Sequence, residues 1–232
     1  MRVRGKDEEL VKGIFGKYRA LELIHSLVLP KRYLEIGVQR GRSLCVSKCS
    51  SVGVDPNPKI KAEVMRTWEY GKQYKLYTET SDEYFSRLEA NDFIPDLVFI
   101  DGMHLIENVL RDFINVERIG HSKTVILIDD VSPVHPVQAE RERRTSNWCG
   151  DVWKIIPILK EYRKDLILTC FEIFPTGLLM VQNINSMDSM LNDNYDNILK
   201  EYQRNIPVPD AVLNREGIDL LPKEAVRKAL VK

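Results

Sequence analysis

Three carboxylates of the sequence come directly after short apolar runs. Asp101 follows Leu97–Ile100, and Asp129 and Asp130 follow Val125–Ile128. Because neighbouring parallel strands end at the same edge of a sheet, these side chains are expected to converge. Like charges repel unless a cation or protons intervene, and oxygen ligands favour a hard ion such as Mg²⁺. We therefore predict a Mg²⁺ site at Asp101, Asp129 and Asp130. The alternative is carboxylates that only bond backbone amides.

His104 lies on the loop after Asp101 and titrates near neutrality, so it is the candidate general base. A hydroxyl group bound to an ion beside Asp101 would have a lowered pKa and could become a nucleophile. Asp101 and His104 are therefore the predicted catalytic residues. The alternative for His104 is a structural role, as the cap of the following helix or as part of the pocket wall.

From Tyr33 onward, short β-branched apolar runs alternate with amphipathic stretches, which is typical of strands and helices built around a parallel sheet. The predicted strands are Tyr33–Val38, Ser51–Asp55, Tyr74–Thr78, Asp96–Asp101, Thr124–Asp129, Leu166–Phe174 and Gly177–Gln182. Helices are predicted to begin near Ser43, Lys59, Ser81, Leu105 and Asp151.

The last two strands are joined by Pro175, Thr176 and Gly177, a link too short for a helical crossover, so they are predicted to form an antiparallel hairpin. The fold class is then α/β, a Rossmann-like doubly wound seven-stranded mostly parallel sheet with an antiparallel last strand. We expect an N-terminal helical segment at 1–30, a core at 31–184 and a C-terminal helical extension at 185–232. Helical patterns in these flanks are formed by Leu10, Ile14, Tyr18, Leu21 and Ile24, and by Lys223–Val231.

A turn with two glycines, Gly37 and Gly41, follows the first strand and leads to a predicted helix start. Glycines let the backbone approach a ligand closely. The turn lacks the GxGxxG pattern of dinucleotide folds, and Glu35 would repel a pyrophosphate but suit a cationic ligand. Asp55, at the end of the second strand, could accept hydrogen bonds from a ribose. The alternative is a plain tight turn, with Asp55 as a helix cap.

Four segments of the chain resemble the class I S-adenosylmethionine methyltransferases, and more narrowly the macrocin-type sugar O-methyltransferases. They are YLEIGVQRGRS, SVGVDP, DLVFIDGMH and LIDD, and the resemblance covers about residues 33–183. It implies S-adenosylmethionine as cofactor and the strand order 3-2-1-4-5-7-6. The cofactor-binding residues that it implies are Glu35, Gly37, Gly41, Ser43, Asp55, Ser81, Asp82 and Asp101.

The same resemblance also implies metal ligands at Asp101, Asp129 and Asp130. The chain departs from that branch at Met103, where the relatives often carry a further aspartate that serves as the base. Ser81 and Asp82 correspond to the loop beside the adenine, although a plain helix cap explains them equally well.

The connection after the fifth strand is long and lies at the expected ligand edge, so we predict a lid that selects the acceptor. Its charged run, with Arg141, Arg143 and Arg144, could equally be a solvated surface. His135 is a predicted substrate contact. The GDVWK string is similar to one in several of the relatives, and this resemblance implies that Trp153 and Lys154 also lie near the acceptor.

Lysines plus arginines number 34, as do aspartates plus glutamates, so no global field attracts nucleic acid. No secretory signal or membrane span is evident, so a cytoplasmic protein that does not bind membranes is expected, with a homodimer possible. The four cysteines show no metal or disulfide spacing.

We predict an S-adenosylmethionine-dependent methyltransferase that uses Mg²⁺ to methylate an oxygen of a small-molecule acceptor, such as a sugar or a natural product. The alternatives are a metal-independent N-methyltransferase, a catalytically silent cofactor-binding module and, disfavoured by Glu35, a nicotinamide-dependent oxidoreductase.

Overall fold

The computed structural model describes residues 16–60, 64, 74–88, 92–220, 226–228 and 230. Most of the helix predicted from Lys59 and most of the predicted helix Lys223–Val231 lie outside these residues, as do Leu10 and Ile14. No helix among the described residues is both long and apolar enough to cross a membrane.

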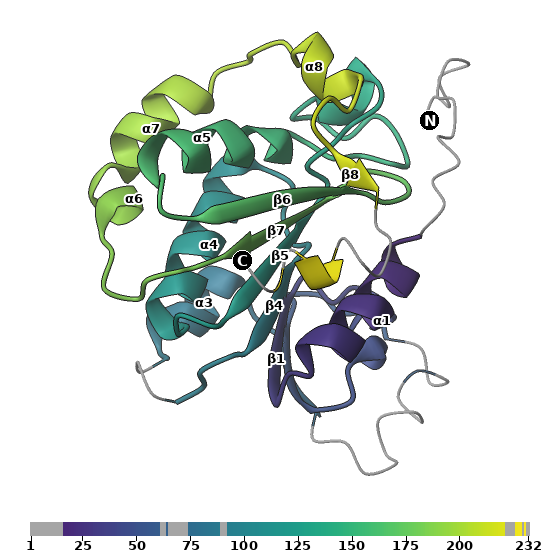
Figure 1. Ribbon diagram of the computed structural model, residues 1–232, viewed down its shortest axis with the longest axis vertical. Helices are drawn as coiled ribbons and strands as arrows, with labels where there is room; N and C mark the ends of the chain where they lie inside the picture. The colour runs from purple at the N-terminus through teal and green to yellow at the C-terminus, as the bar shows by residue number, and fades with distance from the viewer. Residues whose placement is uncertain are drawn as a thin grey trace.

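The described residues form an eight-stranded sheet in the order β3-β2-β1-β4-β5-β7-β6-β8. Strands β1 and β4 to β8 are labelled in Figure 1. The predicted order of the first seven strands is therefore confirmed. Strand β7 runs antiparallel to both β5 and β6, so the predicted hairpin is also confirmed. The strands are β1 Arg32–Ile36, β2 Ser50–Val54, β3 Tyr74–Tyr77, β4 Leu97–Ile100, β5 Val125–Asp129, β6 Ile167–Glu172, β7 Leu178–Gln182 and β8 Asp219–Leu220.

Strand β8 was not predicted. It pairs in parallel with the outer strand β6, so the C-terminal extension adds to the edge of the core sheet.

The helices follow the predicted alternation with the strands. They are α1 Lys17–Val28, α3 Ser81–Ser86, α4 Ile106–Ile119, α5 Ile155–Tyr162, α6 Met190–Asp193, α7 Tyr195–Tyr202 and α8 Asp210–Leu213. Short 3₁₀ turns occur at η1 Leu44–Val46, η2 Pro136–Ala139 and η3 Val152–Lys154. Asp151 precedes η3, which continues into α5, so the helix start predicted there is confirmed.

The α-helix predicted from Ser43 is wrong, because the chain forms only the 3₁₀ turn η1 there. Ser47 returns to an extended backbone at ψ 141°, and its hydroxyl accepts hydrogen bonds from the Cys49 amide (3.3 Å) and the Ser51 hydroxyl (2.8 Å). Serine hydroxyls that bond nearby polar groups compete with helix formation. The segment therefore turns directly into β2.

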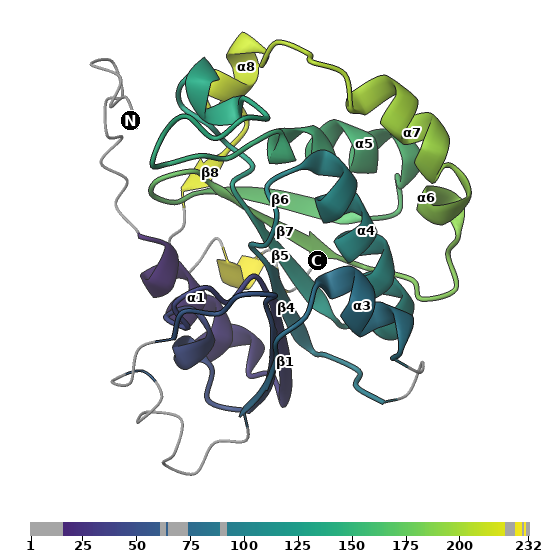
Figure 2. The same ribbon diagram turned by 180° about the vertical axis from the view of Figure 1, so that it is seen from behind.

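Helices cover both faces of the sheet (Figures 1 and 2). Helices α3, α4 and α5 bury one face in an apolar core with the inward side chains of β1, β4 and β5. Helix α1 covers the opposite face through Ala20, Leu21 and Ile24, together with Val226 from the chain's end. Tyr18, which the sequence pattern assigned to the apolar stripe of α1, is 44% exposed; Lys17 lies on the inner side instead.

Candidate active site

The carboxyl ends of β4 and β5 bring two of the predicted acidic residues together. Ile100 is paired with Ile128 in the parallel register, so the next residues, Asp101 and Asp129, lie side by side. Asp130 follows with a left-handed backbone (φ 63°), which turns its side chain toward the loop that carries His104. Of the three carboxylate side chains, Asp101 is the most exposed at 15%, against 1% for Asp129.

Lys17, the first residue of α1, lies between the two strand ends. Its Nζ donates to Oδ2 of Asp101 at 2.7 Å and forms an ion pair with Oδ2 of Asp129. Burial alone would lower the pKa of Lys17, but the charges of Asp101, Asp129 and Asp130 outweigh it and raise the pKa well above its usual value. Lys17 is therefore a permanent cation at this edge.

The two carboxylates respond differently to the same lysine. Burial alone would raise the pKa of Asp101, but the charges of Lys17 and His104 lower it below its ordinary value. The pKa of Asp129 is raised instead, because its deeper burial and the neighbouring carboxylates outweigh Lys17. Asp101 is thus the ionised and accessible member of the pair.

The His104 side chain lies between the carboxylates of Asp101 and Asp130. Its Nε2 lies 3.4 Å from Oδ1 of Asp101, and its Nδ1 lies 3.2 Å from Oδ2 of Asp130. Nδ1 also donates to the carbonyl of Trp148 at 2.7 Å, and the two rings stack at 5.1 Å. Burial alone would lower the pKa of His104, but Asp130 and Asp101 raise it to about 9. At neutral pH the ring is an imidazolium, so it supplies positive charge rather than a free base.

These side chains do not fit the predicted Mg²⁺ site. An ion bound by Asp101, Asp129 and Asp130 would lie beside the ammonium of Lys17, which already contacts Oδ2 of Asp101 and Oδ2 of Asp129. A different group, made of Asp101, His104 and Asp130, has ligand atoms within 4.8 Å of one another. Metal binding there would require a neutral imidazole, whereas both nitrogens of His104 face oxygen acceptors. Mg²⁺ also prefers oxygen ligands.

The glycine turn packs directly on the loop that follows β4. Gly37 has a φ of 89°, and a Cβ at this position would lie 2.0 Å from the carbonyl oxygen of Asp101. Gly41 also has a left-handed backbone (φ 73°), and its amide bonds the carbonyl of Val38. The two glycines therefore allow a tight turn to stand against the loop of Asp101. The sequence motif predicts that a ligand approaches this turn closely. The structure shows that the loop of Asp101 also approaches the turn closely.

Glu35 does not reach the surface of this edge. Its side chain is fully buried, with Oε1 accepting from Ser43 Oγ at 2.6 Å and Oε2 accepting from Tyr33 at 2.8 Å. Burial raises the pKa of Glu35 to about 8, although both hydrogen bonds oppose the shift. The predicted direct contact of Glu35 and Ser43 with a ligand is therefore replaced by a shared internal role, which is to fix the turn.

Asp55 lies where the sequence placed it, at the end of β2 beside the turn. Its Oδ2 accepts from the amide of Gln39 and its Oδ1 from the amide of Asn57, both at 2.7 Å. Each carboxylate oxygen can accept a further hydrogen bond, since it carries two lone pairs. Asp55 thus caps the local backbone and retains capacity for further hydrogen bonds.

Ser81 and Asp82 begin α3, whose N-cap is Thr80 in a capping box with Glu83. Both predicted residues already have protein partners. Ser81 hydrogen-bonds Asp112, and Asp82 receives two hydrogen bonds from Arg111, each of 3.0 Å.

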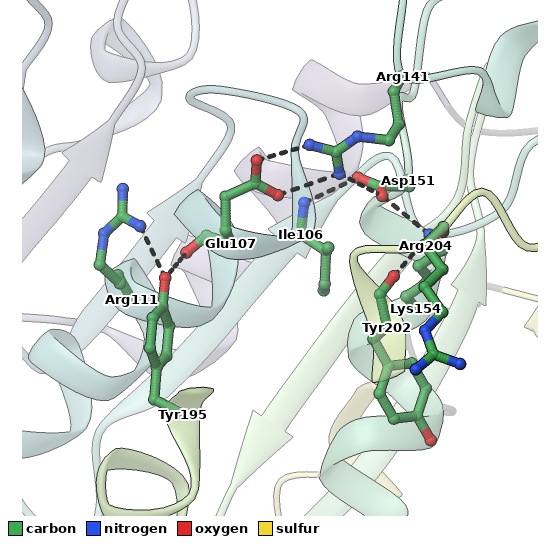
Figure 3. A network of polar contacts seen from close by, with 9 residues as sticks. All are labelled: Ile106, Glu107, Arg111, Arg141, Asp151, Lys154, Tyr195, Tyr202 and Arg204. Atoms are coloured by element: carbon green, nitrogen blue, oxygen red, sulfur yellow. Dashed lines mark hydrogen bonds and ion pairs between the residues drawn. The ribbon is translucent and has the colours of Figure 1, made fainter. Parts of the chain in front are cut away.

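Of the predicted substrate contacts in the lid, His135 and Lys154 have polar protein partners and Trp153 is buried. His135 caps η2, accepting from the amide of Val137 at 3.2 Å, and Trp153 is buried, 5% exposed. Lys154 is 1% exposed, and its Nζ donates to Asp151 and to the carbonyls of Tyr202 and Arg204 (Figure 3). The structure therefore does not offer Trp153 or Lys154 to a ligand.

Two polar residues of the site were missed from the sequence, Lys17 and Asp112. Asp112 is 2% exposed, lies beneath Gly102, and has its pKa raised to about 7 by burial. Both stand on the apolar face of a helix, Lys17 in line with Leu21 and Ile24, and Asp112 in line with its apolar neighbours on α4. A charge on such a face is the signal that could have indicated them.

The order of the first seven strands, the glycine turn after β1 and the acidic residue after β2 define the fold of class I methyltransferases. The family comparison agrees, because residues 34–131 match the model described as a methyltransferase domain. The chain therefore contains a methyltransferase domain, and the predicted enzyme class is confirmed. No curated protein matches the chain significantly.

Solved structures with the same fold include three methyltransferases. One from Podospora anserina, with S-adenosylhomocysteine bound, is 18% identical with a TM-score of 0.53, covering 70% of this chain and 76% of that one. An O-methyltransferase from Bacillus cereus, in complex with the same compound, is 16% identical with a TM-score of 0.52, covering 69% and 77%.

The third is an O-methyltransferase from Streptomyces achromogenes involved in tomaymycin synthesis, in complex with S-adenosylmethionine. It is 16% identical with a TM-score of 0.52, covering 71% of this chain and 78% of that one. At these identities the likeness establishes the fold.

Proposed function

We propose that the chain is an S-adenosylmethionine-dependent O-methyltransferase that acts on a small hydroxylated acceptor, such as a sugar or a natural-product compound. The observation that carries the proposal is the convergence of Asp101, Asp129 and Lys17 beside the Gly37 turn, within a methyltransferase domain. The Bacillus and Streptomyces structures, both of O-methyltransferases, support the oxygen acceptor.

The cofactor would lie along the carboxyl ends of β1, β2 and β4. Asp55 keeps acceptor capacity for the ribose hydroxyls, and the Gly37 turn keeps the backbone free of a side chain that would collide with the loop of Asp101. When bound, S-adenosylmethionine supplies an electrophilic methyl group on a sulfonium. Glu35 acts indirectly, because it holds Ser43 and so the shape of the turn.

Methyl transfer to oxygen needs a group to take the hydroxyl proton and a positive charge beside the developing oxyanion. Asp101 is ionised and the most exposed of the three carboxylates, so it is the proposed base. Lys17 and the imidazolium of His104 flank it and would offset the charge of the acceptor oxygen. His104 thus changes role, from the predicted base to a source of positive charge.

Calorimetric titration tests the cofactor class. We expect S-adenosylhomocysteine to bind with a dissociation constant of about 1 μM to 100 μM, a range worth roughly 5 to 8 kcal/mol, and NAD not to bind. Binding of NAD alone would refute the proposal. Labelled S-adenosylmethionine would then be incubated with sugars, phenols and nucleotide-linked hydroxyl compounds, each beside its amine analogue. Label on the amines alone would make the chain an N-methyltransferase.

A further inference from the structure

Helix α1 is attached to the carboxyl edge of the sheet by its first turn. The amide of Lys17 donates to the carbonyl of Phe174 at 3.2 Å, and Gly16 forms a β-bridge with the same residue. Phe174 follows β6, whose carboxyl end lies at the same edge as those of β4 and β5. The backbone of Lys17 is therefore fixed at the edge by contacts that do not involve its side chain.

The side chain of Lys17 extends from this fixed point to the ends of β4 and β5. Nζ contacts Oδ2 of both Asp101 and Asp129, and it lies 5.9 Å from the centre of the Phe99 ring beneath it. The side chain of Lys17 as a whole is 23% exposed. Apart from this ion pair, neither carboxylate oxygen of Asp129 has a hydrogen-bond partner among the described residues.

A divalent ion bridging Asp101 and Asp129 would compete with Lys17 for the same two oxygens. The other oxygens offer no easy alternative, because Oδ1 of Asp101 faces His104 at 3.4 Å and Oδ1 of Asp129 is buried. Two cations at such short range repel each other strongly where water is scarce. The ammonium therefore has to leave before an ion can bind to both strand ends.

We propose that Lys17 takes the place of a divalent ion in this methyltransferase, as a built-in cation that holds Asp101 and Asp129 together and closes their oxygens to Mg²⁺. The role of Lys17 in turnover rests on the proposed function, whereas its competition with a divalent ion does not. It follows that removal of the ammonium creates a divalent-ion site.

Mn²⁺ alone, titrated into the full-length protein and followed by electron paramagnetic resonance, tests this competition directly. Lys17→Met should bind one Mn²⁺ at least tenfold more tightly than the unmodified chain. Lys160→Met removes an exposed lysine from α5 and should behave like the unmodified chain. The gain should disappear in Lys17→Met combined with Asp101→Asn. Tight Mn²⁺ binding by the unmodified chain, equal to that of Lys17→Met, would overturn the proposal.

Two further measurements guard against a misfolded variant. Lys17→Gln keeps a polar side chain and should give the same gain in Mn²⁺ affinity, with circular dichroism reporting the fold. If neither variant folds, the Mn²⁺ titration of the unmodified chain still tests the proposal. Tight Mn²⁺ binding by that chain refutes the proposal, and no tight binding supports it. Once an acceptor is known, turnover should stay within twofold between chelator and added Mg²⁺. Tenfold stimulation by Mg²⁺ would contradict the role of Lys17, while failure to bind S-adenosylhomocysteine would contradict only the proposed function.

Discussion

Two lysines of this chain, Lys17 and Lys154, are both held by carboxylates, yet their surroundings differ. Lys154 is 1% exposed and donates to Asp151 at 3.0 Å and to the carbonyls of Tyr202 and Arg204 at 2.7 and 2.8 Å (Figure 3). Three donors thus meet three acceptors. The Nζ atom of Lys17 forms its ion pairs with carboxylates, and the side chain is 23% exposed.

The comparison separates a structural ion pair from a functional one. Around Lys154, Asp151 also accepts from Arg141 and from the amide of Ile106, so the network joins the lid, α4 and the C-terminal extension. Both carboxylate oxygens of Asp151 have protein partners. Around Lys17, by contrast, Oδ1 of Asp129 has no hydrogen-bond partner among the described residues.

The largest effect is expected from Asp101→Asn, which removes the proposed base and the main partner of Lys17. An amide cannot take the acceptor proton, so turnover should fall by about 10²-fold to 10⁴-fold. Steady-state rates with labelled S-adenosylmethionine measure this. Asp196→Asn, an exposed change on α7, should leave the rate unchanged. Full activity of Asp101→Asn would mean that the site at the sheet edge is not catalytic.

Lys154→Met should affect stability instead. It leaves Asp151 with less positive charge and two carbonyls without a donor, so the free energy of unfolding should fall by about 3 kcal/mol. Urea unfolding measures the change, with Lys160→Met expected to stay within about 0.5 kcal/mol of the unmodified chain. S-adenosylhomocysteine affinity should not change. A loss of that affinity without a loss of stability would give Lys154 the ligand role that the sequence suggested.

His25 is a buried imidazole whose pKa is shifted by burial rather than by a neighbouring carboxylate. It is 8% exposed, packs edge-on against Tyr33 at 4.6 Å, and burial lowers its pKa to about 4. Because the unfolded chain takes up this proton near pH 6.5 and the folded chain only near pH 4, stability is lost as pH falls between these values. The loss should reach about 3 kcal/mol at pH 4.

His25→Phe should lack that component of the acid loss, as shown by unfolding curves at pH 7 and pH 4. If the free energy of unfolding falls equally with pH in both proteins, the pKa of His25 is the same in the folded and the unfolded chain, and the prediction is wrong.

The smallest effect is expected from Arg111→Ala, which breaks the two hydrogen bonds to Asp82 and one of 2.7 Å to Tyr195. The Asp82 side chain is 50% exposed and that of Arg111 is 34% exposed. Thermal unfolding should therefore show a loss below about 1 kcal/mol. The same variant frees Asp82, so a tenfold change in S-adenosylhomocysteine affinity would place Asp82 at the cofactor.

Local patterns predicted the fold well because each strand and most helices are short segments with their own periodicity. The hairpin, for instance, followed from the three residues 175–177 alone. Strand β8 has only two residues, too few for a pattern, and its partner lies far away in the sequence. An α-helix was predicted from Ser43 where only the short turn η1 forms, because serine hydroxyls, rather than apolar spacing, decide where the turn ends.

The candidate site was predicted only in part because its ion pairs join distant segments. Spacing could indicate that Asp101 and Asp129 end neighbouring strands, but Lys17 lies 84 residues before Asp101. Glu35 lies in β1, within the strand predicted from the sequence, but its contacts depend on Tyr33 and Ser43 meeting both of its oxygens. The sequence indicated which residues belong to the site, whereas only the folded structure showed which side chains they contact.

The contact between Gly150 and the loop of His104 limits how this protein can be redesigned. Gly150 has a φ of 56°, and a Cβ there would lie 1.7 Å from the carbonyl oxygen of His104. The amide of Asp151 donates to that same oxygen at 3.2 Å. A lid grafted from a relative would therefore have to be joined outside residues 149–151, since any bulkier junction would push the imidazole ring out of its place between the carboxylates.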